Sequence, residues 1–592
     1  MARSPKKKLL KKGATSASKP ASYDAAEAGL GASTGAPLLG GLATTVPIHH
    51  GEPAYPEGDS VAEQEAMYKI LARRSSDMLP SVKGEVNLFD RSHFGLLVNY
   101  AVIGFLNGLL PAMVYPLFKL YLNMESYQMS AAKSIIQLPW SYKTFFGILT
   151  DHYPILGYRR KSYILLGWLL CFAALMVLAY SPTVRPYYAP GEIQRTKSLS
   201  LRVIENPEAP TAGARFLIEM LLVCLGYVIV DVACDGIMVE LAQHEHIDMR
   251  GNAQTTTYIV RFTGNLFGVL AAALGLNGSA YGGSFDWSLS YETVFFCCSL
   301  VTAVGTVCAV FYLVEEPYLA HLDQHPFREM WRIVQQRAMW QLMAFHFLNT
   351  FFNKFGFSGY SAMKENWVGV EPLASSLSTC FSTLLFIVAS VLMKLFLLNA
   401  SWRWLMFTCS IVTIATNLAV CLITTFDVVR NQWFFLGGPQ LAVIPDGMRH
   451  VIAGFVTVEI AEHGFEGATY SLLTTVHNLA SPFASVIYNV VDGHFAVSDS
   501  DIASDSNFVR WQVATCLLIA AGMQVAGLAT LPLLPDQKQH AQELKFHGSS
   551  SRIAGAMALI VACLALAWAT TVNLLAINSS TACLRIAGGR GC

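Results

Sequence analysis

Charged residues are scarce in this sequence of 592 residues. Lys, Arg, Asp and Glu make up 14% of it, whereas hydrophobic residues make up 53%. A soluble chain carries about a quarter charged residues, so too few are present here to cover a water-exposed surface. The composition therefore predicts an integral, multi-pass membrane protein.

The sequence also lacks the features of several other protein classes. Its 40 basic and 40 acidic residues balance, whereas a nucleic-acid-binding domain has a basic excess. None of the 13 cysteines forms a CxxC pair, which argues against a zinc site or a dense disulfide framework. No GxSxG, Walker A or dinucleotide-binding glycine motif occurs in a suitable context, so we expect no enzyme activity, no ATP-driven transport and no cofactor.

The first 90 residues differ in composition from the rest. They are rich in Gly, Ala, Ser, Pro and charge, without a run long enough to cross a bilayer. We expect 1–90 to be a disordered tail. Twelve Lys and Arg precede the first apolar segment, so the positive-inside rule places this tail in the cytosol. Contact of the basic cluster 6–12 with anionic lipid is an open alternative.

The remainder is a succession of apolar segments, each long enough to cross about 30 Å of hydrocarbon as a helix. We predict twelve spans, at 94–122, 130–150, 161–180, 214–238, 254–277, 291–314, 339–358, 374–398, 402–426, 434–461, 467–491 and 508–534. A thirteenth is predicted at 553–577, with a re-entrant or interfacial course as the alternative. The fold class is thus an all-α membrane protein.

Twelve spans suggest two bundles of six. The charged connection 315–338 separates a first bundle, 91–314, from a second, 339–535, and 536–592 holds a polar linker with the additional helix. Two related bundles around a central site are the arrangement of a secondary transporter. The loop charges support this topology in part, because 278–290 and 492–507 contain no Lys or Arg, whereas 181–213 contains four on the side where few are expected.

One segment, 138–161, has the sequence LPWSYKTFFGILTDHYPILGYRRK. Gly147 permits close approach of neighbouring backbones, and Asp151 is predicted at a helix end. Arg159 and Arg160 follow after a short turn that contains Gly157. Because a carboxylate paired with a guanidinium can hold one conformation and release it in another, we predict that these five residues form a conformational latch.

The fourth span carries an acidic pair. Asp231 and Asp235 are one helical turn apart, so both carboxylates project from one face of an otherwise apolar segment. Charge at that depth is costly and should face a cavity or a cationic partner. Arg261 in the fifth span and Lys143 in the second are candidate partners. We expect these four residues to bind substrate or protons; a structural ion pair, or snorkelling of Lys143, is the alternative.

Other polar residues of the spans are further candidates. Asn99 and Asn107 share a face of the first span, where they bind a polar ligand or simply join helices, and Gly104 with Gly108 permits close helix contact. Weaker candidates in the second bundle are Asn349, Asn353, Lys354, Asp446, Arg449, His477 and Asn478. The group His244, His246 and Asp248 lacks zinc-site spacing, so we expect no metal.

Two segments resemble the folate-biopterin transporter (BT1) family of the major facilitator superfamily. The first is 138–161, with Pro-Trp before a lysine and then GxxxDxxPxxGYRR. The second is GYVIVDVACDGIMVELAQHE at 226–245, followed by RGNAQTTTYIVRFTGNLFG at 250–268. Five residues separate Asp151 from Gly157, instead of the two or so of the common superfamily signature. The resemblance covers 94–536.

The resemblance implies a transporter of folate or pterin compounds that works by alternating access. A pterin ring offers an amino group and a ring NH to a carboxylate and stacks on aromatic rings, while a folate tail calls for Arg or Lys. We expect proton coupling, since a desolvated aspartate can bind and release a proton. The expected partners are this substrate, protons and the lipid bilayer, without nucleic acid. The alternatives are a carrier of another small organic anion and, in a different class, a polytopic membrane enzyme or a non-transporting receptor.

Overall fold

The computed structural model describes residues 86–124, 132, 135–192, 202–283, 285–315, 325–577, 581 and 584. All of these residues belong to one compact unit, which lies within Pro80–Cys592. The predicted tail therefore lies almost wholly outside the described residues. Within them the structure is helical, and extended pairing is limited to isolated β-bridges.

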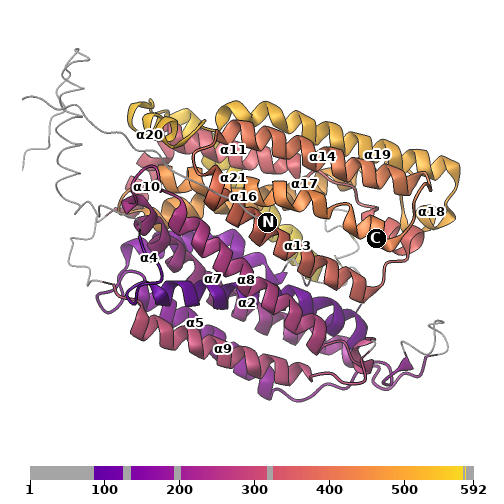
Figure 1. The fold of residues 1–592 in the computed structure, drawn as a ribbon. Helices are drawn as coiled ribbons and strands as arrows, with labels where there is room; N and C mark the ends of the chain where they lie inside the picture. Colours follow the sequence, from indigo (N-terminus) through magenta and orange to yellow (C-terminus); the bar gives the residue numbers. More distant parts are fainter. Residues whose placement is uncertain are drawn as a thin grey trace, which may run out of the picture. The chain divides into compact units, whose positions relative to one another are not determined.

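Helices of the first half, defined as residues 86–315, follow one another along the chain (Figure 1). They are α2 (Phe94–Val114) with η1 (Tyr115–Tyr121), η2 (Leu138–Tyr142) with α4 (Lys143–His152), α5 (Lys161–Tyr180), η4 (Ala209–Ala212) with α7 (Gly213–His244), α8 (Asn252–Gly275), η5 (Ser279–Tyr281) and α9 (Tyr291–Tyr312).

The second half, residues 325–535, has a similar succession of helices, and two more helices follow it. They are α10 (Pro326–Gln335), α11 (Arg337–Asn353), α12 (Tyr360–Ala362) with η6 (Met363–Val368), α13 (Pro372–Leu392) with η7 (Met393–Leu397), α14 (Trp402–Thr425), α15 (Gln432–Gly437), α16 (Gln440–Ile460), α17 (Glu466–Asp492), α18 (Asp499–Ser504), α19 (Asn507–Ala526) with η8 (Gly527–Leu533), α20 (Lys538–His547) and α21 (Arg552–Ile577).

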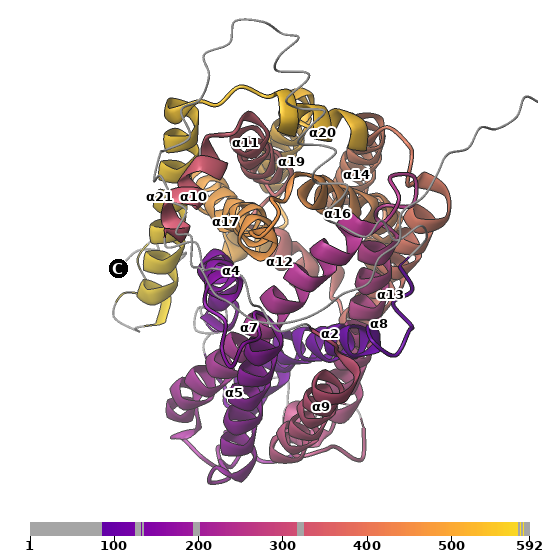
Figure 2. The same ribbon diagram turned by 90° about the vertical axis from the view of Figure 1, so that its left-hand side faces the viewer.

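Ten helices among the described residues are long and apolar enough to cross a membrane, and the predicted thirteenth segment is one of them, at Arg552–Val572. Three predicted spans do not meet this standard. Helix α4 has only ten residues, α11 has 17, and α17 has 27 but is rich in polar residues. These three helices pack on one another, with α17 between α4 and α11 (Figure 2). Their polar side chains therefore face protein instead of lipid, which removes the need for an apolar sequence.

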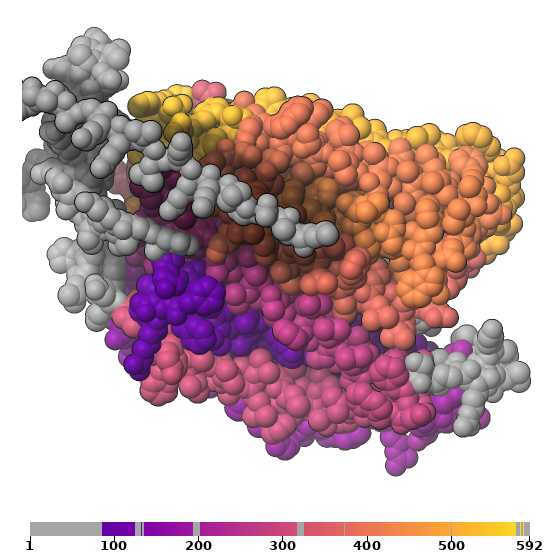
Figure 3. Space-filling view, in the orientation of Figure 1, coloured from indigo at the N-terminus to yellow at the C-terminus, as the bar shows by residue number. Residues whose placement is uncertain are grey.

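Each half has its own apolar core. The largest cluster of buried side chains is drawn from Leu88 to Leu313, with three members from the second half, and the next cluster is drawn almost entirely from the second half. Figure 1 shows the indigo-to-magenta helices on one side of a seam and the orange-to-yellow helices on the other. On the face drawn in Figure 3, the surface is hollowed along this seam. The division into bundles at 91–314 and 339–535 stays a prediction.

Helices α2 and α8 are in backbone contact through glycines. A Cβ atom on Gly104 would lie 1.9 Å from the carbonyl oxygen of Arg261, and one on Gly264 would lie 2.1 Å from that of Ala101. Small residues permit this approach, as the sequence predicts for Gly104 and Gly108. Because α8 is held against α2, Arg261 is brought to the level of the acidic residues on α7.

Candidate functional site

Four charged side chains from three helices meet at the centre of the first half, and we call them the charge cluster. Nζ of Lys143 on α4 lies 2.7 Å from a carboxylate oxygen of Asp231 and 2.7 Å from one of Asp235, both on α7. Nη1 of Arg261 on α8 lies 2.8 Å from the other oxygen of Asp231. The structure thus brings all four predicted residues together. Two positive and two negative charges leave the cluster neutral.

Two aromatic side chains complete the charge cluster. The hydroxyl of Tyr100 on α2 donates a hydrogen bond of 2.9 Å to Asp235. The ring of Trp140 lies 5.1 Å from Nζ of Lys143 and 5.2 Å from Cζ of Arg261, within the range of cation–π attraction. Sequence reasoning assigned neither residue a role, because an aromatic residue in an apolar helix gives no signal of its own.

Burial of the charge cluster is nearly complete. The exposed fraction is 0% for Asp231, 2% for Asp235 and 3% for Lys143, whereas the Arg261 side chain is 15% exposed. Buried charges are tolerated when they are paired, and here each acid has a cationic partner. In this conformation each acid therefore forms an ion pair, and Arg261 is the most exposed member of the cluster.

A second pair of aromatic residues joins the halves beside the charge cluster. The hydroxyls of Tyr258 on α8 and Tyr470 on α17 are 2.8 Å apart, and the side-chain amide of Gln254 donates to Tyr258 at 3.2 Å. Tyr258 precedes Arg261 by three residues on α8, and Tyr470 follows Ala468, which bonds to Asp151, by two residues on α17. This bond closes the space between the halves on that side.

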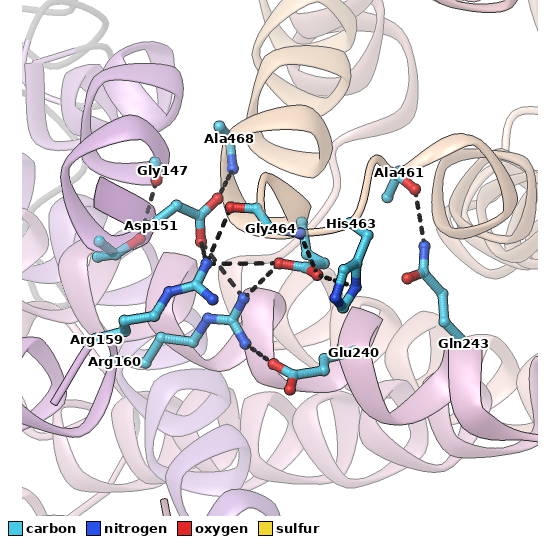
Figure 4. A network of polar contacts seen from close by, with 12 residues as sticks. Gly147, Asp151, Arg159, Arg160, Glu240, Gln243, Ala461, His463, Gly464 and Ala468 are labelled. Carbon is cyan, nitrogen blue, oxygen red and sulfur yellow. Dashed lines mark hydrogen bonds and ion pairs between the residues drawn. The ribbon is translucent and has the colours of Figure 1, made fainter. Parts of the chain in front are cut away.

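The predicted latch spans the seam at the helix ends near Asp151, which we call the latch end (Figure 4). One carboxylate oxygen of Asp151 accepts from the backbone N–H of Ala468 at 2.7 Å, and the other lies 3.4 Å from both Arg159 and Arg160. Arg160 is also 2.9 Å from Glu466 at the start of α17. The latch of the first half is therefore bound directly to the second half.

The structure explains why glycine occupies both predicted latch positions, 147 and 157. A Cβ atom on Gly147 would lie 2.1 Å from the hydroxyl of Ser471 and 2.6 Å from the carbonyl oxygen of Gly467, so α4 and α17 pack in close contact there. Gly157 has a φ of +82°, a conformation that favours glycine in the turn before Arg159. Each glycine therefore serves the latch geometry.

Three acidic residues of the latch end were not foreseen from the sequence. Glu466 and Glu240 both pair with Arg160. Glu315 accepts from the backbone N–H groups of Arg159, Arg160 and Lys161, the last at 2.7 Å, and so caps the start of α5. These residues are 80 to 306 positions from Arg160 along the chain. No local pattern connects them to it.

Ionisation of the latch end follows from these contacts. Burial alone would lower the pKa of Arg160, but the carboxylates of Asp151, Glu466 and Glu240 raise it overall. His463 lies in the connection before α17, with Nδ1 3.2 Å from Glu466. The hydrogen bond to Glu466 raises the pKa of His463 above its usual value, although burial opposes this. Among the described residues, no group of three or more His, Cys, Asp or Glu is arranged to hold a metal ion.

The two predicted asparagines lie apart from the charge cluster's contacts. Asn99 is fully buried; its amide donates to the Gly95 carbonyl at 2.6 Å, and its side-chain oxygen accepts from the Trp168 indole at 2.5 Å. This placement favours the second alternative, a hydrogen bond between helices α2 and α5. Asn107 is partly exposed. The residue of α2 that reaches the acids is Tyr100.

Known proteins resemble this chain in sequence. The model of the BT1 family matches residues 103–190. A folate-biopterin transporter of Synechocystis sp. is 23% identical over 391 residues, which are 64% of this chain and 70% of that protein. Folate transporter 1 of Plasmodium falciparum is 41% identical over 64 residues, or 10% of this chain and 13% of that protein. The matched region of the family includes Asp151, Arg159 and Arg160.

Solved structures resemble it in fold. A D-xylose-proton symporter has a TM-score of 0.50 at 12% identity, over 73% of this chain and 97% of that chain. An identity this low bears on the fold alone. The sequence comparisons indicate a transporter and not an enzyme, and the ten long apolar helices of the described residues indicate a multi-pass membrane protein. The chain thus resembles the folate-biopterin transporter (BT1) family in sequence, as its motifs indicate, and resembles the D-xylose-proton symporter in fold.

Proposed function

We propose that this protein is a secondary transporter of folate or pterin compounds that works by alternating access and is coupled to protons. The observation that carries this proposal is the charge cluster, which is shielded from lipid and lies beside a seam that a latch closes at one end. The names of the relatives support the substrate class, since two are a folate-biopterin transporter and a folate transporter.

The conformation described corresponds to the state in which the latch end is closed. Besides the latch, Gln243 on α7 donates to the carbonyl oxygen of Ala461 at 2.9 Å, and Arg250 pairs with Glu459 on α16 at 3.0 Å. With the tail in the cytosol, this end is the cytosolic one. Access to the charge cluster from this end is therefore closed, and breaking these bonds is the step that reverses access.

Substrate binding in this scheme is an exchange of partners. The acids of the charge cluster are occupied by Lys143 and Arg261, and a pterin ring brings an amino group and a ring NH that one carboxylate can accept together. The ring stacks on an aromatic face such as that of Trp140, which already attracts both cations. Binding therefore releases a cation from one acid, which weakens the link between α4, α7 and α8.

Proton coupling follows from charge balance. The charge cluster is neutral, so a proton on Asp231 or Asp235 gives it a net positive charge. A positive site in a medium of low dielectric constant attracts an anion strongly, and the loaded site is again close to neutral. A folate carboxylate and a proton therefore favour each other's binding, which is the thermodynamic requirement for symport.

Counterflow in sealed liposomes tests the proposed function. Purified protein is reconstituted, and exchange of labelled folate, labelled biopterin and a panel of other organic anions is measured. We expect exchange of folate or biopterin. Exchange of another anion alone would make the protein a different carrier. Failure with every solute, in well-folded protein, would instead favour the membrane enzyme or receptor.

A further inference from the structure

Lys354 is a cation of the second half that has no polar partner for its side chain among the described residues. It follows the last residue of α11, and its side chain is exposed. Lys364, ten positions further along, contrasts with it, because Nζ of that residue bonds to the Ser375 hydroxyl at 2.6 Å. An exposed lysine without a protein partner can pair with an anionic ligand.

Lys354 lies near two histidines of the second half. It interacts electrostatically with His450 and His477, which lie near the middle of α16 and α17. The cation therefore belongs to the interior of the second half and not to its rim.

His450 connects Lys354 to the charge cluster. Its ring lies 5.4 Å from that of Tyr258 on α8 and 5.4 Å from that of Phe386 on α13, so it stands between the two halves. It also interacts electrostatically with Arg261. Although three aromatic rings surround it at the midpoint of a helix, His450 is exposed. A side chain that is deep in the protein and yet exposed lines a hollow.

We infer that Lys354 and His450 form an anion subsite, which binds the carboxylate tail of the substrate while the charge cluster across the seam binds its ring. This inference rests on the proposed function and adds the chemical class of ligand and the residues that select it. The charge cluster is neutral, so Lys354 supplies the net positive charge of the hollow. A carboxylate there forms a charge-assisted bond, which a neutral pterin cannot form.

Uptake kinetics of Lys354→Gln and Lys354→Arg test this inference in reconstituted full-length protein. The substrates are labelled folate, which has a carboxylate tail, and labelled biopterin, which has none. We expect Lys354→Gln to raise the KM for folate about tenfold or more, since a bond to a charged group is lost, while the KM for biopterin stays within about twofold. Lys354→Arg restores folate uptake, and the control Lys364→Gln changes neither substrate.

Other outcomes overturn the inference. Equal losses for folate and biopterin in Lys354→Gln, without rescue by arginine, would make Lys354 a structural residue. Unchanged folate uptake would also exclude the subsite. If wild-type protein exchanges other anions but neither folate nor biopterin, the proposed substrate is wrong; the same variant then decides, with the transported anion as probe, whether Lys354 binds its negative group.

Discussion

Lys143 is the residue on which the charge cluster depends most. It contacts both acids, whereas Arg261 contacts Asp231 alone. Without Lys143, Asp235 would keep only the hydrogen bond from Tyr100. An acid left buried without a cation destabilises a protein far more than loss of the whole pair, because its desolvation is no longer offset.

We therefore expect Lys143→Gln to lower the thermal unfolding temperature in detergent. The single substitution should cost about 3–5 kcal/mol, and the charge-balanced double variant Lys143→Gln/Asp235→Asn should recover much of that stability while transport stays lost. Fluorescence-detected size-exclusion chromatography after heating measures both effects. A double variant that is no more stable than the single one would show that the two side chains do not share an ion pair.

The polar members of the site differ in how far sequence predicts them. Asp231, Asp235, Lys143 and Arg261 could be recognised because a charge in an apolar helix needs a partner. Which acid pairs with which cation could not be predicted from the sequence. Lys143 is 88 positions from Asp231, and their contact depends on how α4 crosses α7. Tyr100 could not be recognised at all, because tyrosine is compatible with apolar packing.

At the scale of elements, the start of α5 depends on Glu315. This one carboxylate accepts from three successive backbone N–H groups, those of Arg159, Arg160 and Lys161. The same turn presents both arginines to Asp151. Capping of the helix and geometry of the latch are therefore a single structural feature, although Glu315 lies at the far end of the first half.

Glu315→Ala should weaken the latch although it leaves the latch residues Asp151, Arg159 and Arg160 unchanged. We expect a loss of about 1 kcal/mol from the uncapped helix start, together with slower exchange in liposomes, because Arg159 and Arg160 lose their fixed position. Glu329→Ala is a suitable control, since that residue pairs with Arg332 three positions away on α10. Exchange rates and thermal stability that are equal for the two variants would exclude the capping role.

The latch end should also respond to pH through His463. Its pKa is raised above 6.5 by Glu466 and, across the seam, by Glu240 on α7, so the protonated form stabilises the closed latch. That contribution is complete below about pH 6.5 and is lost as the pH rises through the raised pKa. Spin labels at the exposed positions Leu156 and Phe546 should therefore report a larger population of open latch as the pH rises.

In His463→Gln, the population of open latch that the two spin labels report should depend less on pH. Glutamine keeps a hydrogen-bond donor for Glu466 and does not titrate, so it separates the charge of His463 from its hydrogen bond. An identical pH profile in the variant and the parent would assign the effect to other groups of the latch.

At the scale of the whole molecule, ten of the thirteen predicted spans meet the standard of length and hydropathy in the described part of the chain. Helices α4 and α11 fall below it because they are short, and α17 because it is polar, and α17 packs against both of the others. High hydropathy is needed only where a helix faces lipid. A helix that its neighbours shield from lipid can therefore carry polar residues. The resemblance to a transporter family was confirmed by comparison, whereas the latch partners Glu240 and Glu466 emerged only from the folded chain.

The movement that we propose separates the halves at the latch end while the charge cluster changes partners. A proton on one acid releases a cation and leaves the site positive, which attracts the anionic substrate, so proton and substrate cross together. Both acids are required for this exchange, since each holds Lys143. Neither Asp231→Asn nor Asp235→Asn should prevent membrane insertion, because asparagine is close in size and uncharged.

The most direct measurement is accumulation of labelled folate in liposomes under an imposed pH gradient, for the wild-type protein, Asp231→Asn and Asp235→Asn. We expect the wild type to concentrate folate against its gradient when the substrate side is acidic, and both variants to lose this uphill uptake although they insert normally. Full pH-driven accumulation in both variants would contradict the coupling role of the buried acids.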